Sequence, residues 1–303
     1  MKIKTIFITI VLMLAGRLSA EITEHKITVN NLTRKFYVYT PADLPQTNRP
    51  LVIALHGGGT NGKSMERYSE LDTKADAGKF IVVYPDGTGR LARLLTWNAG
   101  SCCGYAKRKN IDDVMFIKQM IEFLIDKYKI DRARVYVTGI SNGAMMAYRL
   151  VAEIPEYIAA VAAVSGTLEV PAKEVKSPMP ILHFHGTEDK YVPWHGGRGE
   201  RTGKGMSFNS VDATINTWVA VDKAKTPAEV INLPDIKEDG TKVVEHIYAA
   251  TDGKNEVILY EIVGGGHAWP GKTKSERILG KATENINAND IMWKFFKKHS
   301  RQQ

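Results

Sequence analysis

Gly139-Ile140-Ser141-Asn142-Gly143 is the stretch of sequence that decides the fold. It follows the largely apolar run Arg134-Val135-Tyr136-Val137-Thr138 and opens the stretch 144–150, which has a helical pattern. A strand that enters Gly-x-Ser-x-Gly and leaves as a helix is a nucleophile elbow, a sharp turn that exposes a serine at the carboxyl edge of a sheet. The new helix also directs backbone N–H groups toward developing negative charge. The stretch therefore predicts Ser141 as a nucleophile.

Short apolar runs on both sides of this elbow predict a sheet. Runs that are apolar throughout suit parallel strands buried on both faces, and they occupy residues 51–55, 80–84, 135–137, 160–164, 181–184 and 257–262. An amphipathic helix is predicted from Asp112-Asp113 onward, and a further helix over 209–221. Strands at 26–30 and 34–40 form a hairpin that turns at Asn30-Asn31. We predict an α/β fold: a mostly parallel twisted sheet, helices on both faces and an N-terminal antiparallel hairpin.

Residues 1–20 have the pattern of a secretory signal peptide. Lys2 and Lys4 precede the apolar stretch 6–15, and Leu18-Ser19-Ala20 ends in a small residue that suits signal peptidase. The apolar stretch is too short to span a membrane. Residues 21–303 contain no Pro/Gly/Ser linker, composition break or repeat, which predicts a single domain. We expect export to the extracellular space or periplasm and no association with membranes.

The charge of the chain excludes one class of partner. The net charge of +8 falls to +5 without the three basic residues of the leader. The basic clusters at 107–109 and 297–298 are interpreted as solvated surface, and no basic tract is interleaved with aromatic residues. We therefore expect no nucleic-acid binding. The sequence makes no prediction of oligomeric state.

The two cysteines, Cys102 and Cys103, are adjacent. Export favours a disulfide, but neighbouring α-carbons lie about 3.8 Å apart across a trans peptide, below the usual range for disulfides. Either the pair forms a strained ring that stiffens its loop, or both remain buried thiols. We favour the ring, a vicinal disulfide.

A nucleophilic serine needs an acid and a base from later loops, in the order serine, acid, histidine. The run 181–189 ends in two candidate acids, Glu188 and Asp189, and we favour Asp189 because the loop continues outward from it. The base is predicted to be His267, which follows three glycines and precedes Trp269-Pro270. His183 and His185 share a strand face, but no third ligand stands at a suitable spacing, so we predict packing or hydrogen bonding and no metal site.

His56-Gly57-Gly58-Gly59 follows the first apolar run and is typical of an oxyanion loop, in which glycines let backbone amides face a reacting carbonyl. We predict the amides of Gly58 and Asn142 as the two donors. The expected chemistry is attack of Ser141 on an ester carbonyl, with His267 as general base and Asp189 holding the imidazole.

Motifs across nearly the whole of residues 21–303 resemble those of the secreted polyhydroxybutyrate-depolymerase and feruloyl/acetylxylan-esterase family. They are Leu55-His56-Gly57, Trp97-Asn98-Ala99-Gly100, Cys102-Cys103-Gly104, Asp112-Asp113-Val114, Gly139–Gly143, His185-Gly186, Asp189, Val192-Pro193 and Gly266-His267-Ala268-Trp269-Pro270. The resemblance implies an α/β-hydrolase fold, no metal and no organic cofactor. It also supports Ser141, Asp189 and His267 as a catalytic triad.

Family members that attack solid polyester commonly carry an extra polymer-binding domain, for which residues 21–303 have no room. We therefore favour feruloyl or acetyl esters on plant cell-wall xylan, with polyhydroxybutyrate-type polyester or its soluble oligomers as the alternative. Trp97, Trp194 and Trp269 lie in loops predicted to ring the site and can stack on a sugar or phenolic ring, or simply pack, as we prefer for Trp269. The loops 87–104 and 195–205 can overhang the site.

Two rival classes of protein remain. A serine peptidase of this fold would need an additional gating domain, for which no segment is evident. A non-catalytic binding protein on the same scaffold would be expected to lack a member of the triad, whereas Ser141, Asp189 and His267 are all present.

Overall fold

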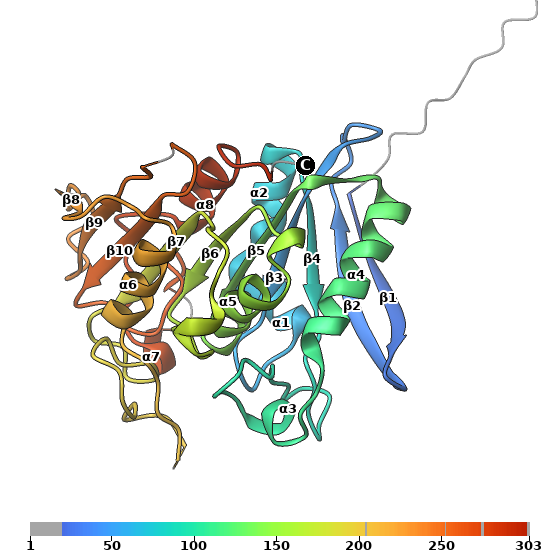
Figure 1. Cartoon of the computed structure of the whole chain (residues 1–303), viewed down its shortest axis with the longest axis horizontal. Helices are drawn as coiled ribbons and strands as arrows, with labels where there is room; N and C mark the ends of the chain where they lie inside the picture. Colours follow the sequence, from blue (N-terminus) through green and yellow to red (C-terminus); the bar gives the residue numbers. More distant parts are fainter. Residues whose placement is uncertain (1–19, 204, 252, 274–275, 302–303) are drawn as a thin grey trace, which may run out of the picture.

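The computed structural model describes residues 20–303 except 204, 252, 274–275 and 302–303. The predicted signal peptide, residues 1–20, thus lies outside the described residues except for Ala20. The strands are β1 (Glu21–Val29), β2 (Leu32–Thr40), β3 (Arg49–Leu55), β4 (Ile81–Pro85), β5 (Ile130–Ile140), β6 (Ala160–Val164), β7 (Ile181–Gly186), β8 (Glu229–Asn232), β9 (Lys242–Tyr248) and β10 (Val257–Val263). They form one sheet in the order β1-β2-β4-β3-β5-β6-β7-β10-β9-β8 (Figure 1).

The centre of the sheet, from β4 to β10, is parallel, and a pair of antiparallel strands flanks it at each edge. The predicted N-terminal hairpin is confirmed, with Asn30 and Asn31 both in the left-handed conformation that a tight hairpin turn requires (φ 49° and 63°). The apolar runs all became strands. The edge strands β8 and β9 were not predicted, because their partly exposed residues lack a clear alternation of apolar and polar positions.

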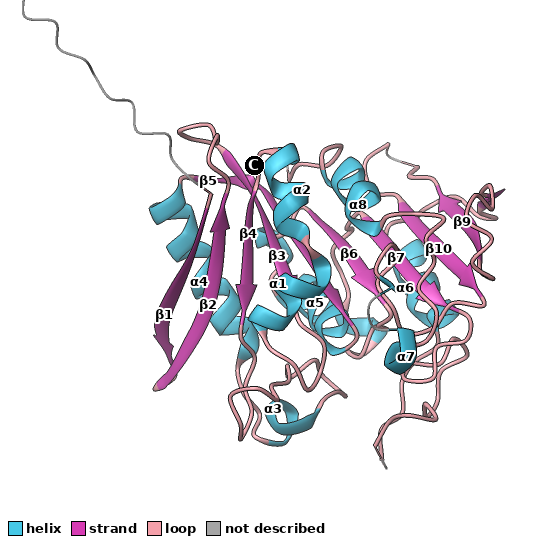
Figure 2. Ribbon diagram, turned by 180° about the vertical axis from the view of Figure 1, so that it is seen from behind, coloured by secondary structure: helices cyan, strands magenta, loops and turns pink. Residues whose placement is uncertain are grey.

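Helices cover both faces of the sheet, as predicted. They are α1 (Gly62–Ser69), α2 (Leu71–Gly78), α3 (Gly104–Arg108), α4 (Asp113–Tyr128), α5 (Asn142–Glu153), α6 (Val211–Val221), α7 (Glu276–Leu279) and α8 (Ala288–Phe296). Helices α4, α5 and α6 lie on one face (Figure 1), and α1, α2 and α8 lie on the other (Figure 2). Each face of the sheet has its own hydrophobic core. Along β3, Leu51, Ile53 and Leu55 pack into the core beneath α4, α5 and α6, whereas Val52 and Ala54 pack into the core beneath α1, α2 and α8. This alternation explains why the central strands are apolar throughout.

The carboxyl ends of the parallel strands meet at one edge of the sheet, where α3, α7 and the long loop before α6 gather (Figure 1). In open α/β sheets this edge is where ligands bind. Within the described part of the chain, no helix combines the length and apolar character needed to cross a membrane.

Candidate active site

Ser141 occupies the turn between β5 and α5. Its backbone is left-handed and strained (φ 57°, ψ −126°), and its amide donates to Val164 O at 2.9 Å, which holds the turn against β6. The turn is too tight for a side chain at its base, since a Cβ on Gly139 would lie 2.7 Å from the carbonyl carbon of Gly143. The glycines of the motif are therefore required by the close approach of strand and helix. Ser141 itself stays partly exposed.

Asp189 and His267 come together from the loops after β7 and β10. The Nδ1–H of His267 donates to Oδ2 of Asp189 at 2.7 Å, and both side chains are almost fully buried. Because a carboxylate only accepts, a neutral His267 carries its proton on Nδ1 and leaves the lone pair of Nε2 free.

The carboxylate of Asp189 is held in its ionised form. Burial alone raises its pKa, but the adjacent His267 and the hydrogen bonds that the carboxylate accepts bring the pKa below its ordinary value. Oδ1 accepts from the amides of Tyr191 and Val192, both at 2.8 Å. The side chain of Glu188, the alternative acid, is not part of this cluster of contacts.

Both Ser141 and His267 line a cavity of about 360 Å³. The residues that line it are Gly57, Gly58, Thr60, Ser64, Met65, Tyr68, Ile140, Ser141, Tyr191, His267 and Leu279. Three of these lie on α1, which sequence reasoning missed because this short helix begins with a glycine and is polar overall. Tyr191 was also missed, although it stands two residues after Asp189; its ring centroid lies 4.9 Å from that of His267.

The loop after β3 is fixed by His56. Its Nδ1 donates to Gly57 O at 2.8 Å, and its Nε2 accepts from the Gly87 amide at 2.9 Å. The hydroxyl of Thr60 also donates to Gly57 O, at 2.8 Å. Because the C=O and N–H of a trans peptide point in opposite directions, the Gly58 amide points away from these two side chains. Burial lowers the pKa of His56 to about 4, so the ring stays neutral.

Asn142 begins α5, and its side chain holds the loop that covers this helix end. Oδ1 accepts from the amide of Trp97 at 2.7 Å, and Nδ2 donates to Trp97 O at 3.0 Å. As a first-turn residue of the helix, Asn142 has a backbone amide with no partner within the helix. One residue thus both anchors the loop and offers an N–H beside Ser141.

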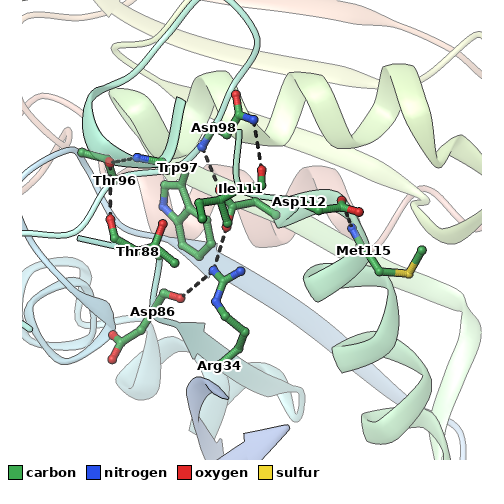
Figure 3. Close-up of polar contacts among 12 residues, drawn as sticks. Arg34, Asp86, Thr88, Thr96, Trp97, Asn98, Ile111, Asp112 and Met115 are labelled. Atoms are coloured by element: carbon green, nitrogen blue, oxygen red, sulfur yellow. Dashed lines mark hydrogen bonds and ion pairs between the residues drawn. The ribbon is translucent and has the colours of Figure 1, made fainter. Parts of the chain in front are cut away.

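A buried ion pair between Arg34 and Asp113 also anchors this loop, and Figure 3 shows Arg34 beside Asp86 and the loop residue Asn98. Arg34 on β2 donates to Oδ1 of Asp113 at 2.7 Å and to Asp86 O at 3.2 Å. The other oxygen of Asp113 accepts from the amide of Asn98 at 2.8 Å. Both ionised side chains are nearly inaccessible, at 3% and 0% exposed. Removing either one would therefore leave a buried unpaired charge under the loop.

Cys102 and Cys103 are joined by a disulfide in this loop, directly before α3. Both residues are buried, and the amide of Cys103 donates to Trp97 O at 3.1 Å.

The structure buries two of the three tryptophans, and for Trp269 this is the packing role that we preferred from the sequence. Trp97 and Trp269 are fully buried. Their indole N–H groups donate to His56 O at 3.0 Å and to Asn289 Oδ1 at 2.9 Å, respectively. Neither ring has a face free for a substrate, so both are packing residues. Trp194 is half-buried, and its ring lies edge-on to His185 at 6.0 Å.

Arg201, in the loop predicted to overhang the site, lies close to α7, whose Leu279 lines the cavity. The guanidinium of Arg201 donates to Ile278 O, and the hydroxyl of Tyr191 donates to the same oxygen at 3.3 Å. These contacts connect the loop to the rim of the cavity.

A mostly parallel sheet with a serine at a strand-to-helix turn, and a histidine–aspartate pair on later loops, defines an α/β-hydrolase. The chain belongs to the phospholipase/carboxylesterase family, whose model matches residues 40–204. It is therefore a hydrolase of carboxylic esters.

Curated relatives carry related names. A putative esterase, NocK, from Nocardia uniformis subsp. tsuyamanensis is 28% identical over 89% of this chain and 81% of its own length. The bifunctional acetylxylan esterase/xylanase XynS20E of Neocallimastix patriciarum is 34% identical over 52% of this chain and 21% of its own. Poly(3-hydroxyalkanoate) depolymerase C of Paucimonas lemoignei is 25% identical over 78% of this chain and 58% of its own. The chain thus matches only part of the last two proteins.

Solved structures share the fold at low sequence identity. An acetyl xylan esterase from Aspergillus awamori superposes with a TM-score of 0.63 at 18% identity, over 91% of this chain and 99% of its own. The feruloyl esterase module from Clostridium thermocellum, as an S954A mutant complexed with sinapinate, gives 0.53 at 17% identity, over 83% of each chain.

Proposed function

We propose that the protein is a secreted serine carboxylesterase in which Ser141 is the nucleophile, His267 the general base and Asp189 the acid. The observation that carries this proposal is the 2.7 Å hydrogen bond from His267 to Asp189 at the wall of a cavity that Ser141 also lines. That bond leaves Nε2 of His267 as the free base that a serine nucleophile needs.

The proposed reaction has two halves. His267 Nε2 takes the proton of Ser141 as the hydroxyl oxygen bonds to the ester carbonyl carbon, and the amides of Gly58 and Asn142 stabilise the resulting oxyanion. The tetrahedral intermediate then expels the alcohol, which receives the proton from His267 and leaves an acyl-enzyme. Water attacks in the same way, and the acid and free Ser141 are released.

We propose feruloyl or acetyl esters on xylan as the substrate. The names of the relatives favour this class, and so does the cavity, in which Met65, Tyr68 and Tyr191 supply apolar and aromatic surface for a flat acyl group. Polyester is the second candidate, which the match to a polyhydroxyalkanoate depolymerase supports. The pattern of residues 1–20 and the disulfide support export, and the single continuous sheet supports one domain.

Active-site labelling tests whether the protein is an enzyme. A fluorophosphonate should label the native protein at Ser141, and Ser141→Ala should abolish the labelling while leaving the circular dichroism spectrum unchanged. A native protein that is not labelled would indicate a binding protein on a hydrolase scaffold.

Parallel product release tests the substrate. The purified protein is incubated with feruloylated xylan, acetylated xylan and amorphous polyhydroxybutyrate, and ferulate, acetate and 3-hydroxybutyrate are quantified by chromatography. We expect ferulate or acetate to exceed 3-hydroxybutyrate by at least about tenfold in initial rate, a difference of about 1.4 kcal/mol in the activation barrier. The opposite order would select the polyester.

A further inference from the structure

Two buried histidines stand on β7 directly before the loop of Asp189, and the mechanism proposed above does not use them. His183 and His185 are two residues apart on the strand, so their side chains lie on the same face of the sheet, the one covered by α5 and α6 (Figure 1). Both are fully buried, and their rings are stacked nearly parallel with centroids 5.3 Å apart. Among the described residues they belong to no group of three potential metal ligands.

The hydrogen bonds fix which nitrogen of each ring carries the proton. Nε2 of His185 lies 2.8 Å from Val192 O, which can only accept, so this nitrogen is the donor. Burial lowers the pKa of both histidines, and each neutral ring has a single N–H. Nδ1 of His185 must therefore accept from Nε2 of His183 at 3.1 Å. Nδ1 of His183 in turn accepts from the hydroxyl of Tyr148 on α5, at 2.6 Å.

This one-way series of hydrogen bonds ends at the carbonyl of Val192, next to Asp189. Nε2 of His185 lies 3.5 Å from Oδ2 of Asp189, the same oxygen that accepts from His267. Val192, whose carbonyl accepts from His185, also donates its amide to Oδ1 of Asp189. The N–H that His185 donates to Val192 O therefore lies beside one carboxylate oxygen of Asp189, and Val192 itself donates to the other.

We propose that Tyr148, His183 and His185 form a positioning relay that sets the orientation of the Asp189 carboxylate for His267. The proposal rests on the proposed function, in which His267 is the base. The key residue is His183, because its N–H satisfies the buried Nδ1 lone pair of His185 and so reinforces the tautomer that Val192 O selects. Without that donor, His185 is free to carry its proton on Nδ1, and its Nε2 lone pair then faces Val192 O and Asp189 Oδ2. That arrangement is repulsive and displaces the carboxylate.

Two substitutions at one position separate this relay from simple packing. His183→Phe fills the space but cannot donate to His185, whereas His183→Gln retains an amide N–H donor and an oxygen that can accept from Tyr148. We expect His183→Phe to lower kcat by about tenfold to 100-fold, the order expected for a misplaced catalytic group, with KM within about twofold. His183→Gln should recover most of this loss.

Trp218 provides a matched control in the same core. It is fully buried, its ring lies 5.6 Å from that of Tyr148, and its indole nitrogen has no hydrogen-bond partner among the described residues. Trp218→Phe therefore perturbs the packing around the relay without removing a hydrogen bond. We expect it to lower the melting temperature while kcat stays within about threefold of the wild type.

The protonation states give a readout that does not depend on activity. Nitrogen-15 NMR of the labelled wild-type protein should show His185 protonated at Nε2 and bare at Nδ1, and His183→Phe should populate the other tautomer. A proton on Nδ1 of His185 in the wild type overturns the relay, whether or not the protein hydrolyses esters. In an active enzyme, an unchanged kcat in His183→Phe, or an equal loss in His183→Gln, also overturns it. Failure of the wild type to hydrolyse any ester instead refutes the proposed function.

Discussion

Two histidines of this molecule stand beside glycine triplets, and their surroundings differ in one respect. His56 precedes three glycines, and His267 follows three. Both are buried, but backbone groups occupy both ring nitrogens of His56. In His267 one nitrogen is bound to Asp189, and the ring lines the cavity. The comparison teaches that a buried histidine becomes a candidate base when one nitrogen is left uncommitted beside space for a substrate.

Among the substitutions that test this comparison, replacing His267 should have the largest effect on kcat. His267→Ala is expected to lower kcat on a soluble aryl ester by about 10⁴-fold to 10⁶-fold, because the nucleophile loses its base. Its free energy of unfolding in urea should stay within about 1 kcal/mol of the wild type. His246→Ala, which removes a partly exposed histidine paired with Glu261, is the control and should leave kcat unchanged.

Asp189→Asn tests what holds His267 in its tautomer. The amide can donate where the carboxylate only accepts, so the ring turns its protonated nitrogen away from residue 189, and kcat should fall by about 10⁴-fold. Glu188→Gln is the matched control, since Glu188 is the neighbouring acid that the sequence offered as an alternative, and it should change kcat by less than about twofold. Equal losses in the two variants would contradict the assignment of Asp189.

His56→Ala should have the opposite effect to the one expected for His267→Ala, because it should lower the free energy of unfolding rather than act first on kcat. It leaves the buried Gly87 amide without its acceptor and opens a cavity, which together should cost about 2–4 kcal/mol in the free energy of unfolding. Equilibrium urea unfolding measures this loss. The comparison fails if His56→Ala unfolds like the wild type.

The pH dependence of stability offers the subtlest test. The pKa of His56 is about 4 in the folded protein and about 6.5 in the unfolded chain, so the unfolded state binds a proton first as the pH falls. Stability contributed by neutral His56 is present above pH 6.5 and is lost between pH 6.5 and pH 4, by about 1.4 kcal/mol per pH unit. His56→Gln should therefore have a flatter profile than the wild type in this window. Between pH 7 and pH 8 the two profiles should run in parallel.

The central strands and the elbow were predictable because local sequence dictates them. Short, fully apolar runs are typical of parallel strands buried on both faces, and Gly-x-Ser-x-Gly between a strand and a helix is a local signature of the elbow. The same holds for α4, whose N-cap Asp112 accepts from the amide of Met115 at 2.9 Å. The space that requires Gly143, however, is set by distant backbone, the carbonyls of Leu55 and His56. The pairing of Asp189 with His267 remained a prediction from chain order until the structure placed the two side chains in contact.

Features that depend on distant contacts were not predictable. Trp97 stands in a long loop, where exposure is the usual expectation, yet its side chain is fully buried. Its amide donates to the side chain of Asn142, and its indole N–H donates to His56 O. The direction of hydrogen bonding through His183 and His185 needs the position of Val192 O, which no local pattern reveals. The lining of the cavity by α1 likewise depends on how that helix packs rather than on its composition.

The double contact between Asn142 and Trp97 has a consequence for engineering. A grafted segment that replaces the stretch around residue 97 must still present its main chain to this one amide side chain. If it does not, the first turn of α5 loses the two hydrogen bonds that hold Asn142 next to Ser141. Mutant libraries that aim to alter substrate range should therefore vary residues 90–94 and leave residues 96–98 and Asn142 unchanged.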